Sequence, residues 1–294
     1  MSGVRVQGFR SASAIEPWLK ENTRLSAAGR QSLAGTVLSL LSRINNDRTI
    51  SIGISGAPGS GKSTLSRALV FCLDTEGIPA FRLSLDDYYF GRAERARLAR
   101  EIHPLFQQRG VPGTHDLGKL LTDLDRLRQG EIGDLRLPVF DKSMDDRAQD
   151  GRSRIPETAP QVILVEGWCV GAMPQALSDL TAPVNDVERR QDPGSHWRNH
   201  VQQAWQRMYD ALGERLEQVW YIRVPDWDCV IDWRWQQEQE LAQKNLHSRQ
   251  DVANFLASFE RIFRHMQVSY PQWADLVIEA GREHDFRLPD QDRI

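Results

Sequence analysis

The chain contains few cysteines, no long apolar run and no excess of basic residues. Its three cysteines among 294 residues are far apart and include no CxxC pair, so the sequence indicates neither a disulfide framework nor a zinc site, and we expect reduced thiols. No apolar run approaches the ~18 residues that a membrane span needs, and residues 1–10 lack an apolar stretch after their charges. We therefore expect no membrane partner and a cytoplasmic location.

The distribution of charge excludes one further class of partner. The formal net charge is -3, and basic and acidic residues are interspersed along the chain. Such a chain has no extended basic field to hold a long polyanion, so we do not expect nucleic acid as a partner. The apolar fraction of 40% and the charged fraction of 26% are typical of a globular protein with a sizeable core.

The spacing of apolar residues predicts an α/β fold with a mostly parallel sheet. Short apolar runs predict strands at residues 49–55, 80–85, 162–165, 219–224 and 274–279. Helical spacing predicts helices within residues 15–43 and at residues 62–75, 117–128, 197–218, 226–244 and 250–266. Proline and glycine breaks predict a loop over residues 181–195. Strands that alternate with helices in this way are typical of a three-layer fold.

A phosphate-binding motif follows the first predicted strand. The pattern GxxxxGK[ST] is matched in full by Gly56, Ala57, Pro58, Gly59, Ser60, Gly61, Lys62 and Ser63, and Thr64 adds a second hydroxyl. Backbone N–H groups of such a loop converge on phosphate oxygens, Lys62 can reach the β- and γ-phosphates, and Ser63 can ligate Mg²⁺. The loop therefore predicts binding of ATP with Mg²⁺, but ATPases, GTPases and kinases all share it.

Acidic residues follow two further predicted strands. Asp86 and Asp87 come after residues 80–85, and Glu166 comes after residues 162–165. Ligands of open α/β folds bind at the carboxyl ends of the strands, so one carboxylate could lie near an acceptor hydroxyl and another near the metal. The alternative is structural, with Asp86 as a cap and Glu166 as a polar residue where a strand ends.

Several segments resemble a family of kinases. GAPGSGKST (56–64), LSLDDYY (83–89) and VEGW (165–168) resemble the phosphoribulokinase and uridine kinase group of P-loop kinases. More narrowly, RGVPGTHD (109–116), LPVFDKS (137–143), VEGW and DWRWQQE (232–238) resemble, in this order, the motif series of the D-glycerate 3-kinases. The resemblance implies a P-loop kinase fold, ATP and Mg²⁺ as cofactors, and a small-molecule acceptor, D-glycerate, which would become 3-phosphoglycerate.

The resemblance also implies roles for individual residues. Asp86 would be the general base, Lys62 and Arg234 would meet the charge on the transferred phosphoryl group, and Arg234 would belong to a lid. Magnesium would be held by Ser63, Glu166 and Asp86. The acceptor would be bound by Asp87, Tyr88, Arg109, His115, Asp116, Asp141 and Lys142.

The chemistry of these residue types leaves some alternatives open. An arginine such as Arg109 or Arg147 can grip the carboxylate of glycerate with two parallel hydrogen bonds. Asp116 could instead be the N-cap of the helix that follows it, and His115 could be a satisfied turn histidine. We interpret the tryptophans at helical spacing, Trp233 among them, as core residues rather than as a platform for bases.

The motifs suggest a division of the chain into segments. We expect a helical N-terminal extension at residues 1–46 and a P-loop kinase domain at residues 47–294. Within that domain, residues 91–160 are interpreted as an acceptor-site insertion and residues 226–270 as lid helices. Two other functions stay open, namely a kinase for another small acceptor such as pantothenate, a nucleoside or a sugar acid, and an ATP-binding switch without an acceptor.

Overall fold

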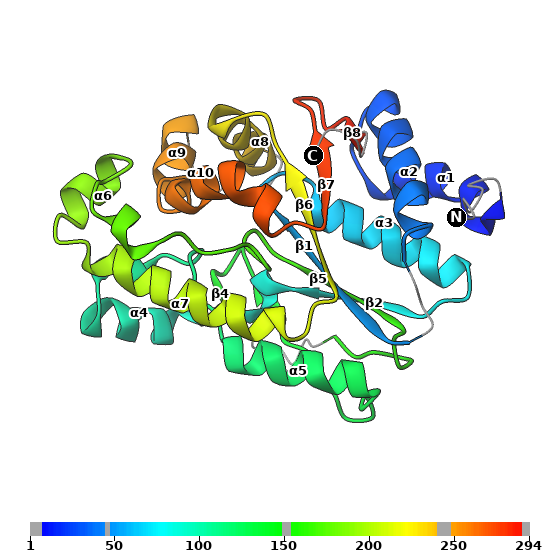
Figure 1. The fold of residues 1–294 in the computed structure, drawn as a ribbon, viewed down its shortest axis with the longest axis horizontal. Helices are drawn as coiled ribbons and strands as arrows, with labels where there is room; N and C mark the ends of the chain where they lie inside the picture. The colour runs from blue at the N-terminus through cyan, green and yellow to red at the C-terminus, as the bar shows by residue number, and fades with distance from the viewer. Residues whose placement is uncertain (1–7, 45–47, 149–153, 240–247, 290–294) are drawn as a thin grey trace.

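The computed structural model describes residues 8–44, 48–148, 154–239 and 248–289, and a six-stranded sheet lies at its centre (Figure 1). The strands are β1 (Ile50–Gly56), β2 (Ala80–Ser84), β5 (Val162–Glu166), β6 (Gln218–Arg223), β7 (Leu276–Ala280) and β8 (Phe286–Arg287). They lie in the order β2-β5-β1-β6-β7-β8, and each neighbouring pair is parallel except β7 with β8. The predicted α/β fold with a mostly parallel sheet is confirmed.

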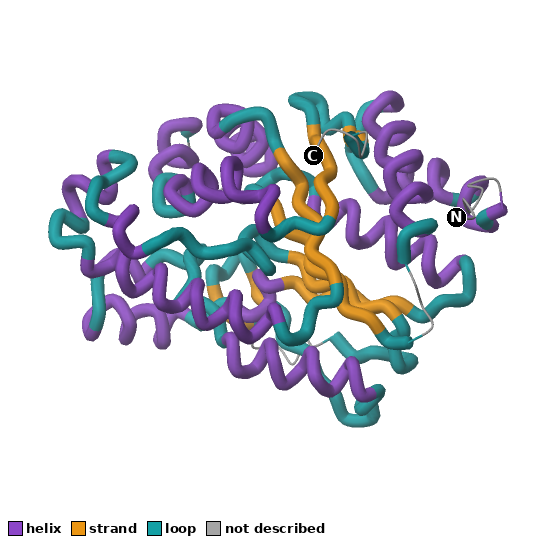
Figure 2. The backbone as a smooth tube through the Cα atoms, in the orientation of Figure 1, coloured by secondary structure: helices purple, strands orange, loops and turns teal. Residues whose placement is uncertain are grey.

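Helices cover both faces of the sheet and form three layers with it. Those of the described residues are α1 (Ile15–Asn22), α2 (Ala27–Leu41), α3 (Lys62–Thr75), α4 (Arg92–Glu101), α5 (Leu117–Gln129), α6 (Asp186–Gln191), α7 (His196–Gly213), α8 (Trp227–Gln239), α9 (Arg249–Leu256) and α10 (Glu260–Ser269). In Figures 1 and 2, α3 lies with α1 and α2 on one side of the sheet, and α5 and α7 lie on the other. Strands β1 and β5 are buried along their whole length because both faces are covered.

The N-terminal helices pack on the edge of the sheet that ends in β8. Ser32 on α2 accepts a hydrogen bond from the backbone N–H of Phe286 (2.9 Å), and Thr36 donates one to the Phe286 carbonyl (3.3 Å). Leu33 and Val37, on the same helix, are fully buried. The predicted boundary at residue 46 and the first seven residues of the predicted extension lie outside the described residues. None of the helices that the structure describes has the length and hydropathy needed to cross a bilayer.

Three sequence predictions differ from the structure. The single helix predicted at residues 250–266 is two helices, α9 and α10, because the chain turns at Phe259, whose ring packs against Trp168 with centroids 4.8 Å apart. Residues 181–195 are not all loop, since Asn185 accepts a hydrogen bond from the Glu188 N–H and so caps the short helix α6. Helix α7 ends at Gly213 rather than at residue 218, where β6 already begins. Of the helix predicted at residues 226–244, the part after Gln239 lies outside the described residues.

Helix α4 and a short hairpin of β3 (Phe140–Asp141) and β4 (Asp146–Arg147) lie in the segment interpreted as an insertion, and neither was predicted. Helix α4 has no apolar stripe to reveal it. It is held instead by a charged side chain, because buried Arg95 donates hydrogen bonds to the carbonyls of Phe90 and Gln107. Apolar periodicity does not detect a helix that is anchored in this way.

Candidate active site

The phosphate loop joins β1 to the N-terminus of α3. Gly59 and Gly61 have positive φ angles of 81° and 89°, a conformation that glycine adopts without strain. A Cβ on Gly61 would also lie 2.7 Å from the ring of Phe286, so the loop approaches the β7–β8 hairpin too closely for any side chain there. The Lys62 ammonium donates a hydrogen bond to the carbonyl of Ala57 (2.8 Å), and burial lowers the pKa of Lys62 although Glu166 and Asp86 oppose this.

Ser63 of α3, Arg82 of β2 and Glu166, the last residue of β5, meet beside the loop. The Glu166 Oε1 atom accepts a hydrogen bond from the Ser63 hydroxyl at 2.9 Å and pairs with the Arg82 guanidinium at 2.7 Å. Glu166 is buried, at 3% exposure, and these two partners offset part of the cost of burying its charge. The arrangement fixes one carboxylate against the hydroxyl of the phosphate-loop serine.

A second carboxylate, that of Asp86, follows β2. Its Oδ2 atom lies 2.6 Å from the ammonium of Lys142, which comes from the β3–β4 hairpin. Burial alone would raise the pKa of Asp86, but the charge and hydrogen bond of Lys142, together with Lys62, hold it well below its usual range. Burial, the Asp86 charge and a hydrogen bond to Asp86 raise the pKa of the Tyr89 hydroxyl well above 10, so this neighbour stays protonated. Asp86 is therefore an ionised carboxylate with fixed neighbours.

These groups line a cavity of about 670 Å³. Its walls are formed by Pro58, Gly59, Gly61, Lys62, Ser63, Thr64, Asp86, Tyr89, Arg109, Lys142, Ser143, Glu166, Trp168, Arg234, Gln237, Phe255 and Phe259. Four of these side chains are cationic and two are anionic, so the walls carry an excess of positive charge. A cavity of this kind favours a ligand with several negative charges.

Two of the cations are arginines that face the cavity from different elements. Arg234, on α8, pairs with buried Glu238 at 2.7 Å, and burial lowers the pKa of Arg234 although Glu238 opposes this. Arg109 pairs with Asp145 and lies over the ring of Phe140, 5.4 Å from its centroid. Each arginine is thus held by an acidic partner, and its charge still contributes to the cavity wall.

The loop that carries Arg109 is positioned by a close contact and a hydrogen bond. The Trp168 Nε1–H donates to the carbonyl of Gly110 at 2.8 Å. Gly110 has a φ of 142°, and a Cβ there would lie 2.2 Å from the ring of Phe259. Only glycine fits at this position. The hydrogen bond from Trp168 to Gly110 connects the VEGW segment (165–168) to the RGVPGTHD segment (109–116) and holds the latter in place.

Comparisons with known proteins relate the chain to kinases. No family model matches the chain. A protein of Schizosaccharomyces pombe described as "Uncharacterized kinase mug58" is 32% identical over 203 residues, which are 66% of this chain and 72% of that protein. The chloroplastic D-glycerate 3-kinase of Arabidopsis thaliana is 28% identical over 252 residues, which are 80% of this chain. The chain belongs to the same family of kinases as the Schizosaccharomyces pombe protein.

The chain corresponds to only part of one relative and shares its fold with a solved structure. The aligned region is only 53% of the Arabidopsis thaliana protein, so the chain spans about half the length of that relative. Among solved structures, the D-glycerate 3-kinase of Cryptococcus neoformans has a TM-score of 0.65 at 24% identity and covers 90% of this chain and 98% of that one. This last likeness shows that the two P-loop kinases share their fold.

The residues of this kinase fit a magnesium ion of the kind that P-loop enzymes use. Ser63 supplies a hydroxyl, Glu166 supplies a carboxylate in direct contact with it, and Asp86 lines the same cavity. The described residues contain no cluster of three or more His, Cys, Asp or Glu side chains able to cage a metal. Mg²⁺ is usually held by one or two protein groups together with phosphate and water.

Most residues that the sequence predicted for the kinase site line the cavity. They include Asp86, Arg109, Lys142, Glu166 and Arg234, besides Pro58, Gly59 and residues 61–64 of the phosphate loop. Gly56, Ala57 and Ser60, also predicted, are buried and are not part of the cavity wall. The fold therefore brings together groups that are up to about 180 positions apart in the sequence, as expected for the strand ends of an open α/β sheet.

Asp87 and Tyr88, which were predicted to bind the acceptor, point away from the cavity. Asp87 accepts a hydrogen bond from the Phe140 N–H (3.3 Å) and pairs with Arg154 at 3.6 Å, and burial raises its pKa. The Tyr88 hydroxyl donates to buried Asp123 at 3.0 Å. Both side chains hold the turn after β2 to neighbouring elements, and Asp86 is the acid of this pair that faces the cavity.

His115 and Asp116 lie one layer behind the cavity. The His115 ring stacks on Tyr89 with centroids 4.3 Å apart, and burial lowers its pKa to about 4, so it is neutral at physiological pH. Asp116 accepts a hydrogen bond from the Lys119 N–H (3.1 Å), which caps α5, and it pairs with Arg147 at 3.0 Å. Asp116 therefore caps α5, as the alternative interpretation held. Arg147, the other arginine considered for the carboxylate of glycerate, is paired with Asp116.

Six residues that line the cavity were not predicted as site residues. They are Tyr89, Ser143, Trp168, Gln237, Phe255 and Phe259. Asp141, predicted to bind the acceptor, is absent from the wall and accepts hydrogen bonds from the Ser143 N–H (3.0 Å) and hydroxyl (2.5 Å), which shape the turn that carries Lys142. Tyr89, Ser143, Trp168 and Gln237 stood in motifs already quoted, so their position next to predicted residues could have identified them. Phe255 and Phe259 had no such signal.

Proposed function

We propose that this kinase transfers the γ-phosphate of ATP to a hydroxyl of D-glycerate and releases 3-phosphoglycerate and ADP. The observation that carries the proposal is a single cavity in which the phosphate loop, two strand-end carboxylates and four cations face one another. Each part has a task in phosphoryl transfer, which depends mainly on positioning and on stabilising negative charge.

The excess of cations supports an acceptor that is itself an anion. Lys62 and Arg234 lie on the phosphate loop and the adjacent helix α8, where they would meet the charge of the triphosphate. Arg109 and Lys142 come from the opposite segments, beside Asp86. A neutral acceptor such as a nucleoside needs no cation there, whereas the carboxylate of glycerate does, and arginine matches it with two parallel hydrogen bonds.

Asp86 is the group we assign to the acceptor hydroxyl. Lys142 keeps it ionised, so it accepts a hydrogen bond from the hydroxyl and orients that oxygen for in-line attack. A carboxylate with a low pKa is a weak base, but the transition state of phosphoryl transfer is loose and the hydroxyl proton is lost late. As the hydroxyl oxygen bonds to phosphorus, its proton passes to Asp86 and the bridging oxygen leaves with ADP.

Magnesium would be held by Ser63 and Glu166, with Asp86 beside them. When bound, the ion would neutralise charge on the β- and γ-phosphates. In the structure Glu166 is oriented by Arg82, which fixes the carboxylate facing Ser63.

We further expect a small-molecule substrate as the main partner, with neither nucleic acid nor membrane, and a cytoplasmic location.

The relatives support the same acceptor. The proteins from Arabidopsis thaliana and Cryptococcus neoformans are both described as D-glycerate 3-kinases, and the first aligns with 80% of this chain. A shorter match, 30% identical over 116 residues, is to a uridine kinase of Leuconostoc citreum, but it covers only 40% of the chain. The acceptor panel below therefore contains both compounds.

The test is a coupled assay of ADP release with MgATP and a panel of D-glycerate, L-glycerate, uridine, pantothenate and ribulose 5-phosphate. A reaction without acceptor is the control. Turnover with D-glycerate, with the product identified as 3-phosphoglycerate, is the expected result. Turnover with another acceptor alone would overturn the substrate, and ATP hydrolysis that ignores every acceptor would overturn the kinase activity itself.

A further inference from the structure

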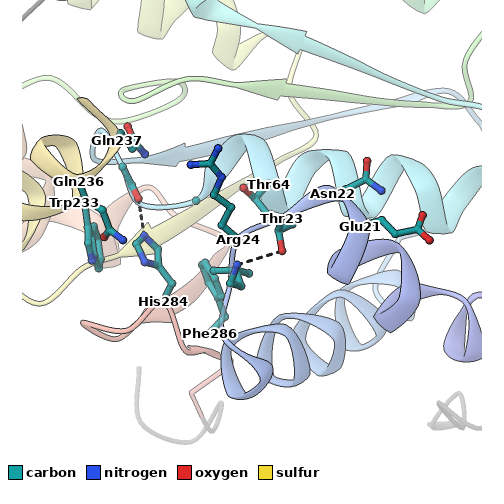
Figure 3. Close-up of a pocket in the computed structure, with 13 residues that line it drawn as sticks. Glu21, Asn22, Thr23, Arg24, Thr64, Trp233, Gln236, Gln237, His284 and Phe286 are labelled. Carbon is teal, nitrogen blue, oxygen red and sulfur yellow. Dashed lines mark hydrogen bonds between the residues drawn. The ribbon is translucent and has the colours of Figure 1, made fainter. Parts of the chain in front are cut away.

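A second cavity, of about 420 Å³, lies against the phosphate loop (Figure 3). Its walls are formed by Glu21, Asn22, Thr23, Arg24, Leu25, Gly59, Gly61, Thr64, Trp233, Gln236, Gln237, His284 and Phe286. Gly59, Gly61, Thr64 and Gln237 line the larger cavity as well. The two cavities therefore meet across the phosphate loop.

The residues that line only the larger cavity indicate which part of a nucleotide enters the smaller one. Ser63, Asp86 and Glu166 line only the larger cavity, so the terminal phosphate that is transferred lies there. A triphosphate that follows the loop then has its other end on the side of Thr64 and Gly61, at the mouth of the second cavity. The nucleoside is attached to that end.

One wall of the second cavity is aromatic. Trp233 on α8 is buried and its ring lies 4.3 Å from that of His284, at 32°. His284 has a φ of 55°, which is rare for a residue with a side chain, and its Nε2 atom lies 2.9 Å from the carbonyl of Gly59. Such backbone strain persists where surrounding contacts demand it. The His284 ring lies against the phosphate loop, where a flat ring surface suits a nucleobase.

The facing wall comes from the N-terminal helices. This wall is the end of α1 with the turn that follows it (residues 21–25), and it is held by the Thr23 hydroxyl, which donates to the Leu19 carbonyl at 2.7 Å, and by the Ser26 cap of α2. Figure 3 shows the Arg24 side chain extending from this turn toward Thr64 and into the space between the turn and α8. The turn therefore offers polar and cationic groups opposite an aromatic surface.

We infer that the nucleoside of the triphosphate binds in this second cavity and that residues 21–25 form one wall of the nucleotide site. The base lies against the partly exposed ring of His284, which packs on the buried core residue Trp233, and the polar side chains of residues 21–25 contact its edge or the ribose. The inference rests on the proposed function only in taking a nucleoside triphosphate as the ligand of the phosphate loop. It assigns a role in substrate binding to the N-terminal helices.

The first test is chemical protection of a cysteine placed in the turn. Cys72, Cys169 and Cys229 are all buried, so an Arg24→Cys variant gains one accessible thiol, and labelling by a fluorescent maleimide reports on the cavity. Saturating ATP should slow labelling at least about tenfold, whereas inorganic tripolyphosphate, which has the phosphates without the nucleoside, should leave the rate unchanged. Lys20→Cys, on an exposed position of α1 outside the cavity, is the matched control and should label at the same rate throughout.

Unchanged labelling with ATP would overturn the inference. Equal protection by ATP and tripolyphosphate would also overturn it, because the phosphates alone would then explain the effect. No acceptor is present in this experiment, so its outcome is independent of whether D-glycerate is the substrate.

A second variant narrows the cavity from the opposite side. Gln236 is exposed on α8 and lines only the smaller cavity, so Gln236→Trp should weaken ATP binding at least about fivefold by occupying the space of the base, as measured by calorimetry. Tripolyphosphate should bind as before. Gln239→Trp, exposed on the same helix and outside both cavities, is the control. Unchanged affinity of Gln236→Trp for ATP would contradict the placement of the nucleoside.

Discussion

The Asp86 carboxylate and the Lys142 ammonium lie 2.6 Å apart, although 55 residues separate them in the sequence. Asp86 stands at the end of β2 and Lys142 on the hairpin of β3 and β4, so the pair ties the hairpin to the edge of the sheet. The pKa of Lys142 is raised by Asp86, although burial opposes this, and the pKa of Asp86 is lowered in return. Both groups are therefore charged at neutral pH, as the role proposed for Asp86 requires.

The first prediction concerns the acceptor hydroxyl. Asp86→Asn should lower kcat by about 100-fold or more, because an amide cannot take the proton of the hydroxyl, while the Kd for MgATP should change by less than about threefold. Single-turnover phosphotransfer and nucleotide titration measure the two effects. Asp87→Asn is the matched control, since Asp87 is held by Arg154 and Phe140 outside the cavity, and it should keep most of the activity. An active Asp86→Asn enzyme would refute our assignment.

The second prediction concerns pH. Lys142 holds the pKa of Asp86 down, so removing its charge in Lys142→Met lets burial raise that pKa. Activity requires the ionised carboxylate and is lost as the pH falls through the pKa of Asp86. The acid limb of the kcat profile should therefore move to higher pH by about 1 to 3 units in Lys142→Met. Lys20→Met, at an exposed position remote from the cavity, should keep the original profile, and an unmoved limb in Lys142→Met would show that another group controls it.

The third prediction concerns recognition of the acceptor's carboxylate. Arg109→Ala should raise the KM for D-glycerate by about 10- to 100-fold, because a charged hydrogen-bonding partner is lost, and should leave the KM for ATP within about threefold. Asp145 keeps Arg95 as a partner at 2.9 Å, so the variant does not strand a buried carboxylate. Steady-state kinetics in both substrates measure the split. Arg100→Ala, on the exposed face of α4, is the control, and an unchanged KM for glycerate in Arg109→Ala would count against an anionic acceptor at this residue.

The fourth prediction concerns the contact that places Arg109. Gly110→Ala puts a Cβ 2.2 Å from the Phe259 ring at a φ of 142°, so it should destabilise the protein by about 2 to 4 kcal/mol in urea unfolding. The displaced loop should also raise the KM for glycerate. Gly213→Ala, at the end of α7 with nothing near its Cβ position, should change stability by less than about 1 kcal/mol. Partial rescue of Gly110→Ala by Phe259→Leu would identify the ring as the cause, and full stability of Gly110→Ala would refute the clash.

Local sequence patterns predicted the parts of the fold that local forces determine. Apolar runs marked β1 and β5 because a parallel strand buried on both faces needs continuous apolar residues. Helix α3 was predicted with its observed bounds, since the phosphate motif specifies where it begins. Helix α4 was missed because its anchor is the buried guanidinium of Arg95, and the break between α9 and α10 was missed because it depends on a contact of Phe259 with a distant tryptophan.

Some features of the candidate site were likewise predictable from the sequence, and others were decided only by the tertiary structure. Sequence motifs alone predicted the phosphate loop, the acids at the strand ends, and Arg109 and Lys142 of the cavity wall, because each belongs to a short pattern with its own chemistry. Which of two adjacent side chains faces the cavity was decided only by the tertiary structure: Asp86 rather than Asp87, and Tyr89 rather than Tyr88. The direction of a side chain after a strand depends on the turn that follows and on partners such as Arg154 and Asp123, which come from distant parts of the chain. The place of the N-terminal turn beside the phosphate loop was likewise settled by packing of α1 and α2 on α3 and β8, a long-range contact that no local pattern specifies.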